Sequence, residues 1–145
     1  MYKIKPGKYY LGDPCYAELK NHTWMDVLDN SDFLEAPCVF DDGTIVAFRT
    51  MYGDGTYFGT MGFGYSVDAG LIGLVPYDMV SDKGHEKIHR DDLMKIFDIQ
   101  TEKSFCEDNG VIELFDLECI DTNGDQDEDE YNYFEDEYNY FDDDE

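Results

Sequence analysis

Short runs of alternating hydrophobic and polar residues fill the first two-thirds of the chain and are interrupted by glycine, aspartate and proline. This pattern predicts β-strands joined by turns. A strand is expected in GKYYLGD (7–13), which ends at the turn dipeptide Asp13-Pro14. A hairpin is expected from PCVF (37–40) and TIVAFRTMY (44–52), because Asp-Gly between β-rich runs favours a tight turn.

The later runs predict further strands. The Gly-Asp-Gly at 53–55 is expected to turn the chain into TYFGT (56–60). Residues 62–80 are predicted to form a strand pair that turns around 68–70 and ends at Pro76. Residues 111–120 are predicted to form one last strand, after a turn at Asn109-Gly110. Four of its residues favour one face: Val111, Phe115, Leu117 and Cys119.

Two short helices are expected between these strands. Thr23 can cap a helix over WMDVL, with Asp26 three residues later as its capping-box partner. Asp91 or Asp92 can cap a second helix through LMKIF (93–97). The resulting fold class is α+β and β-rich: a small curved antiparallel sheet or barrel-like sandwich with one or two short helices. We place a domain boundary after Ile120, which gives a compact domain, 1–120, and an acidic C-terminal tail, 121–145.

The charge is large and unevenly placed. The 145 residues contain 35 acids and 10 bases, for a formal net charge of −25, and residues 121–145 contain 13 of the acids and no Lys or Arg. Such a chain repels nucleic acid and anionic lipid, so we expect no direct nucleic-acid or membrane partner. The expected partner is a basic protein surface. The sequence does not determine the oligomeric state.

Localisation is predicted from what the chain contains. No apolar run approaches the ~20 residues of a membrane span, and MYKIKPGKYYLGDPCY at the start has no secretory apolar region. Four widely separated cysteines, Cys15, Cys38, Cys106 and Cys119, are expected to be reduced. The prediction is a cytoplasmic protein, located in the host cytoplasm if a phage encodes it.

Residues 85–89, His-Glu-Lys-Ile-His, match a zinc-binding pattern that requires a helix. Because Gly84 precedes the pattern and Asp91-Asp92 was expected to start a helix after it, the segment is predicted to cross a loop or a helix N-terminus. We therefore predict no metal site here, and a coincidental exposed segment.

The stretch DTNGDQDEDE (121–130) resembles a calcium loop, with Asp121, Asn123 and Asp125 alternating as ligands do. Gln126 and Asn132 stand where the sixth-position Gly and the twelfth-position Glu belong, so weak, non-specific divalent binding is the most that is expected. No serine–histidine or cysteine–histidine pattern is recognisable. The prediction is a protein that is not an enzyme and has no cofactor.

The tail contains a tandem repeat, EDEYNYF, at 128–134 and 135–141. Blocks of like charge are usually solvated and disordered, and that interpretation stays open. The aromatic rings indicate more than a solubility tail, because disordered acidic segments are normally poor in them. If the tail is helical, four rings follow a 3-4-3 spacing and form one stripe: Tyr131, Phe134, Tyr138 and Phe141.

The spacing of the carboxylates resembles that of a nucleic acid. As a helix the tail would span ~37 Å and carry one carboxylate per ~3 Å, close to the ~3.4 Å between phosphates of one B-DNA strand. As an extended chain it would carry one charge per ~6 Å, which suits an unstacked single strand whose bases the rings could replace.

The stretch GKYYLGDPCY, together with TMYGDGTYFGTMGFGYSVDAGLIGLVP, resembles a group of small, mostly uncharacterised phage and prophage proteins. They share an opening Gly-Asp-Pro-Cys-Tyr, a Trp-containing helix and a later Tyr-x-Val-Asp-Ala-Gly segment, and the likeness covers residues 7–76. It implies no established chemistry. By composition, the chain also resembles phage DNA-mimic inhibitors, acidic proteins that occupy the DNA sites of restriction, repair or CRISPR machinery.

We therefore predict a phage-type acidic inhibitor, acting in anti-defence or host takeover, which mimics nucleic acid and blocks a basic groove of a host protein. Two alternatives remain: a module that inhibits by shape with an accessory tail, and a virion or assembly component. Carboxylates between Asp26 and Asp54 could extend the acidic face. The predicted partner-binding residues are Asp127, Glu128, Asp129, Glu130, Tyr131, Phe134, Glu135, Asp136, Glu137, Tyr138, Phe141, Asp142, Asp143, Asp144 and Glu145.

Overall fold

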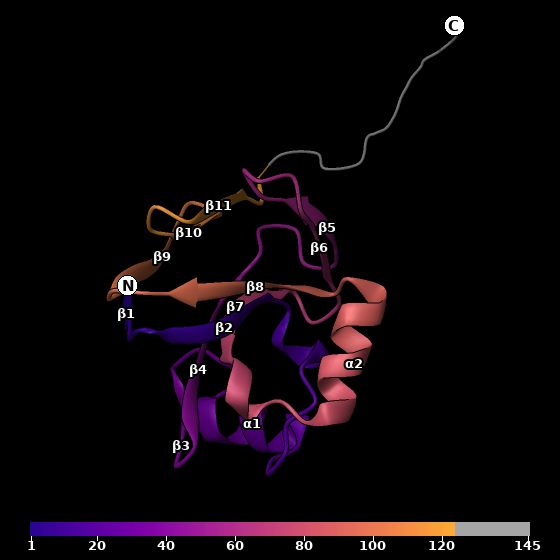
Figure 1. The fold of residues 1–145 in the computed structure, drawn as a ribbon. Helices are drawn as coiled ribbons and strands as arrows, with labels where there is room; N and C mark the ends of the chain where they lie inside the picture. The colour runs from indigo at the N-terminus through magenta and orange to yellow at the C-terminus, as the bar shows by residue number, and fades with distance from the viewer. Residues whose placement is uncertain (124–145) are drawn as a thin grey trace, which may run out of the picture.

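The structure, a computed structural model, describes residues 1–123 and shows an α+β fold rich in antiparallel strands (Figure 1), which confirms the predicted fold class. The strands are β1 (Tyr2–Ile4), β2 (Gly7–Gly12), β3 (Cys38–Phe40), β4 (Gly43–Arg49), β5 (Gly55–Phe58), β6 (Gly64–Val67), β7 (Leu71–Pro76), β8 (Met94–Ile99), β9 (Lys103–Asp108), β10 (Val111–Leu114) and β11 (Glu118–Asp121). The helices are α1 (Trp24–Ser31) and α2 (Asp82–Asp91), with short 3₁₀ helices at Pro14–Tyr16 and Tyr77–Met79.

A five-stranded antiparallel sheet in the order β3-β4-β7-β2-β8 forms the central layer. Successive side chains of a strand point to opposite faces, and both faces of this sheet carry buried residues. Leu11 of β2 belongs to the core on one face and its neighbour Tyr10 to the core on the other. Ile72 of β7 likewise belongs to the first of these cores and its neighbour Leu71 to the second. The sheet therefore has a hydrophobic core on each side.

One face of the central sheet is covered by a four-stranded sheet, β1-β9-β10-β11, and by the β5–β6 hairpin (Figure 1). Tyr65 of the hairpin, Phe105 of β9 and Ile120 of β11 all belong to the core on this side. A single bridge between Gly59 and Ile120 joins the hairpin to β11. The last strand of the described chain therefore lies beside the hairpin.

The two helices supply residues to the core on the opposite face, including Val27 of α1 and Ile88 of α2. Helix α1 begins with the capping box that the sequence predicted. Thr23 Oγ1 accepts the N–H of Asp26 at 3.1 Å, and an Asp26 carboxylate oxygen accepts the N–H of Thr23 at 2.8 Å. These two bonds satisfy backbone donors that the first turn of a helix leaves unpaired. No helix within residues 1–123 combines the length and apolarity needed to cross a membrane.

The prediction of a second helix over residues 93–97 is wrong. Of residues 93–97, expected to be helical, Met94 to Phe97 belong to strand β8, which pairs with β2. The helix lies earlier: Ser81 caps α2, and Asp92 ends it with a left-handed backbone (φ +50°). Residues 85–89 therefore lie inside a helix, and the expectation that they cross a loop or a helix N-terminus is also wrong. Pairing with a strand more than 80 residues away in the sequence, rather than local pattern, makes 94–99 a strand.

Two strand predictions also need correction. Strands β6 and β7 flank a turn at 68–70 as predicted, but they do not pair with each other: β6 pairs with β5, and β7 with β2 and β4. Residues 111–120, predicted as one strand, form the hairpin β10–β11 around Asp116, whose φ is +70°. Its buried face is made by Ile112, Leu114, Glu118 and Ile120, and the odd-numbered residues occupy the less buried face.

Candidate partner-binding surface

The described chain ends beside the loop that precedes β5. Thr122 is fully buried, and both its N–H and its hydroxyl donate to the carbonyl of Gly110, at 2.9 and 2.5 Å. Thr122 Oγ1 also accepts the N–H of Met51 at 2.9 Å, and the side-chain amide of Asn123 donates to the carbonyl of Asn109. These bonds fix the point from which the acidic tail starts.

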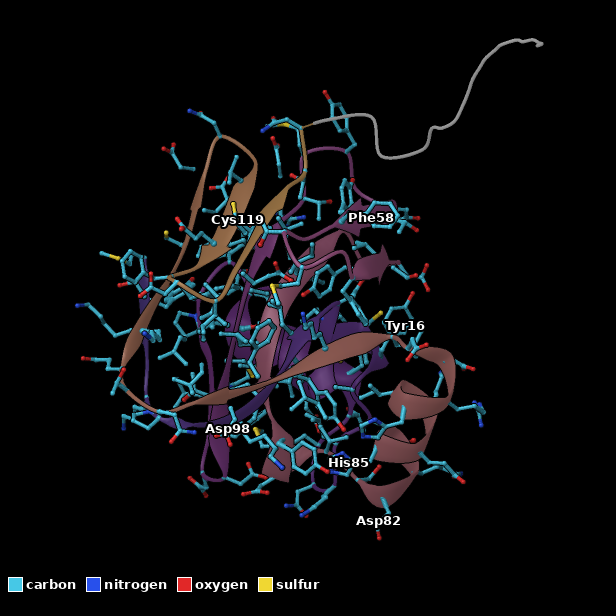
Figure 2. The ribbon with its side chains drawn as sticks, turned by 45° about the horizontal axis from the view of Figure 1, so that its top comes forward. Tyr16, Phe58, Asp82, His85, Asp98 and Cys119 are labelled. Atoms are coloured by element: carbon cyan, nitrogen blue, oxygen red, sulfur yellow. The ribbon has the colours of Figure 1, made fainter. Side chains whose placement is uncertain are left out.

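Four large apolar side chains are exposed next to this point, in residues 51–61, which we call the 51–61 segment. The exposed fractions are 48% for Met51, 68% for Tyr52, 49% for Phe58 and 68% for Met61. Figure 2 shows Phe58 and Cys119 at the same end of the molecule, away from His85 and Asp82. Exposed methionine and aromatic side chains are typical of surfaces that bind another protein.

A buried carboxylate supports the 51–61 segment from inside. Glu118 is 3% exposed and accepts hydrogen bonds from the Tyr65 hydroxyl at 2.6 Å and from both the N–H and the hydroxyl of Thr60 at 2.9 Å. Burial opposes ionisation of Glu118, but these bonds outweigh it and lower its pKa. Burial and the Glu118 carboxylate raise the pKa of Tyr65. A charged Glu118 therefore holds the β5–β6 turn, where Met61 lies.

The carboxylates expected to extend the acidic face, between Asp26 and Asp54, do not gather at the start of the tail. Asp26 and Asp29 lie on α1, and Asp41 and Asp42 lie in the turn between β3 and β4. A hydrogen bond from His22 is the main cause that lowers the pKa of Asp42. Helix α1 and strand β3 lie at the opposite end from β11 (Figure 1). Asp54 stands in the loop before β5 that also contains Met51, whose N–H bonds to Thr122.

The two motifs that carry the phage-protein resemblance meet in the structure. Asp13 is fully buried, and one carboxylate oxygen accepts the N–H of Asp68 at 2.8 Å and of Ala69 at 2.6 Å. The other oxygen accepts the N–H of Cys15 at 3.0 Å. Asp13 thereby fixes the turn at which the chain leaves β6 and enters the central sheet as β7. The motif therefore has a structural role at the turn between two strands that belong to different sheets.

The His-x₃-His pair of α2 faces a buried tyrosine. The Tyr10 hydroxyl lies 2.5 Å from His85 Nδ1 and 3.3 Å from His89 Nε2. Burial, followed by His89, lowers the pKa of His85, and burial raises the pKa of Tyr10 to about 12. Neutral groups satisfy this contact when Tyr10 donates to His85 and accepts from His89. Within residues 1–123, no group of three His, Cys, Asp or Glu side chains could hold a metal ion.

The four cysteines are free thiols. Burial, and then the neighbouring Asp13 carboxylate, raise the pKa of Cys15 to about 12. Burial also raises the pKa of Cys38 and of Cys119. Since the thiolate is the nucleophilic form, these three thiols are poor nucleophiles at neutral pH.

The residues predicted to bind a partner, Asp127 to Glu145, lie outside the described residues, as do Asp125 and Gln126 of the calcium-like stretch. Within that stretch, one carboxylate oxygen of Asp121 accepts the N–H of Asn123 at 2.9 Å. Sequence reasoning did not identify the 51–61 segment as a site. The indication was available, since Met51, Tyr52 and Met61 stand in glycine-rich turns.

The fold and this surface define a small α+β protein that exposes an apolar segment beside the start of an acidic, aromatic tail. Comparisons with protein-family models, with curated proteins and with solved structures found no match to the chain. The resemblance over residues 7–76 therefore stays a prediction.

Proposed function

We propose that this protein is a non-enzymatic inhibitor that occupies a basic, nucleic-acid-binding groove of another protein. The carboxylates of the tail replace phosphates in the groove, and the tail rings replace bases. The 51–61 segment adds apolar contacts at the edge of the same groove. The partner is a host nucleic-acid-binding or defence protein, and the protein acts in phage anti-defence or host takeover.

One observation carries this proposal: the acidic, aromatic tail starts directly beside four exposed apolar side chains. Thr122 bonds to the backbone of Met51, so the start of the tail is close enough to the 51–61 segment for one partner surface to contact both. Long-range attraction between a chain of charge −25 and a basic groove speeds association. Buried aromatic and apolar side chains then supply most of the binding free energy.

A second candidate function is supported by the exposure of the 51–61 segment itself. Here the domain recognises its partner by shape through Tyr52, Phe58 and Met61, and the tail is accessory. The carboxylates of α1 and the β3–β4 turn, at the far end of the domain, serve neither candidate and therefore provide a control.

The experiment compares full-length variants for binding to a partner captured from bacterial lysate. In the first variant the carboxylates of 127–145 become amides, in the second Tyr52 and Met61 become Ser, and in the control Asp29 of α1 and Asp41 of the β3–β4 turn become Asn. Mimicry predicts that the first variant binds at least tenfold more weakly, that short duplex DNA competes, and that the control is unchanged. Loss in the second variant alone, with no effect of DNA, supports recognition by shape and contradicts mimicry.

A further inference from the structure

A cavity between β1, β2, β4 and β7 combines an apolar floor with lysines at its rim. Its volume is about 380 Å³. The floor is buried and apolar, whereas Lys3, on β1, and Lys5, between β1 and β2, are exposed. The lining side chains used below are Ile4, Val46 and Leu74 of the floor, Tyr9, and the cations Lys3 and Lys5.

The charge of this cavity is opposite to that of the rest of the molecule. No Asp or Glu lines it. Among residues 1–123, Lys3 and Lys5 form no ion pair, whereas Arg49 pairs with Glu35 and Lys103 with Asp116. The cavity is therefore an uncompensated positive site with room for an apolar group.

We propose that this cavity binds the acidic, aromatic tail of the same chain. Each EDEYNYF repeat has three carboxylates directly before its rings, and the cavity is lined by two lysines and an apolar floor. One ring of a repeat enters the floor formed by Ile4, Val46 and Leu74. The carboxylates that precede it pair with Lys3 and Lys5.

The tail is long enough to reach the cavity. The described chain ends at Asn123, just after β11, and β1 is the opposite edge strand of the same four-stranded sheet. Three strand spacings of ~4.8 Å separate these edges by ~14 Å. The second repeat begins at Glu135, about twelve residues after Asn123, a reach of ~40 Å when extended. A domain of this length has a radius of gyration of only ~14 Å.

Attachment to the domain favours this occupant over others. A connection of about twelve residues gives an effective concentration in the millimolar range. The tail of a second copy of the chain, at micromolar concentration, would compete for the cavity at a concentration about a thousandfold lower. The tail is therefore held on its own domain until a groove with more positive charge displaces it, so that binding of a partner and binding of the cavity compete.

This inference concerns the protein without a partner, so it can fail while the proposed function holds. Equal amounts of ¹⁴N- and ¹⁵N-labelled full-length protein are mixed and treated with a carbodiimide, which joins amines to carboxylates in direct contact. Peptide mapping is expected to find Lys3 or Lys5 joined to carboxylates of 127–145 within one isotope. The control amines are Lys83 and Lys87, exposed on α2. Mixed-isotope links, or links shared evenly with these controls, would overturn the proposal.

A second measurement tests the ring contact. The methyl resonances of Val46 and Leu74 are recorded in the full-length protein and in a variant in which all six rings of the two repeats are replaced by Ser: Tyr131, Tyr133, Phe134, Tyr138, Tyr140 and Phe141. Removal of the rings should shift both resonances and lower the Lys3 and Lys5 cross-links at least threefold, while the Val27 methyls, in the other core, stay unchanged. Unchanged Val46 and Leu74 resonances in this variant would refute ring insertion.

Discussion

Replacement of Glu118 tests the physical basis of the candidate surface. The carboxylate accepts bonds from Tyr65, from both donors of Thr60 and from the N–H of Cys119 at 3.2 Å. A hydrogen bond to a charged group contributes about 1.5–3 kcal/mol, and a buried donor left unpaired costs about 1–3 kcal/mol. Allowing for the cost of burying the charge, Glu118→Ala should lower the free energy of unfolding by about 3 kcal/mol, and Glu118→Gln by about 1–2 kcal/mol.

The assay is urea unfolding of both variants at pH 7 and over a range of lower pH. The folded-state pKa of Glu118 lies below its ordinary value of 4.5, so its contribution is present above pH 4.5 and is lost as the pH falls through the folded pKa. The Gln variant should lack this part of the acid dependence. Wild-type stability in Glu118→Ala, or an unchanged acid slope in Glu118→Gln, would refute the claim that a charged carboxylate holds the β5–β6 turn.

Three further predictions follow from other residues. Asp13→Asn should lower the free energy of unfolding by about 2–3 kcal/mol, because an amide cannot accept all three N–H bonds. Urea unfolding that shows a loss below ~0.5 kcal/mol, the usual effect of a neutral surface change, would contradict this. Gly73→Ala should cost about 1–3 kcal/mol, because its Cβ would overlap the carbonyl of Val46, and a thermal midpoint equal to wild type would disprove it. The pKa of His85 is lowered on folding, so wild-type stability should fall as the pH drops through ~6.5, and His85→Gln should unfold with a smaller slope over that range.

Sequence reasoning succeeded where the structure depends on neighbouring residues. The capping box of Thr23 and Asp26 identifies the start of α1, because both of its bonds lie within four residues. The turn at 41–43 identifies the β3–β4 hairpin for the same reason. The predicted fold class follows from many such local patterns.

The failures occur where distant residues decide the structure. Residues 94–99 form a strand because β2 pairs with them. Strands β6 and β7 belong to different sheets because each pairs with other strands, and Asp13, more than 50 residues earlier, binds the turn between them. Asp116 turns the chain with a positive φ although it is not glycine, so the β10–β11 hairpin carried no sequence mark.

The candidate site, too, could be predicted from the sequence only in part. Its charge and its repeats are visible in the sequence, but the 51–61 segment becomes a surface only when Thr122 packs against the backbone of Met51, which is 71 residues away. The cavity of Lys3 and Lys5 likewise needs β1, β2, β4 and β7 together.

Competition with duplex DNA for the captured partner tests the central claim most directly. It is measured at 50 and 200 mM salt, with the wild type and with the variant that has amides at 127–145. The account predicts that DNA displaces the wild type, that its affinity falls at least tenfold between the two salt concentrations, and that the variant binds far more weakly. A complex of unchanged affinity in the presence of DNA, of added salt and of the neutralised tail would contradict it.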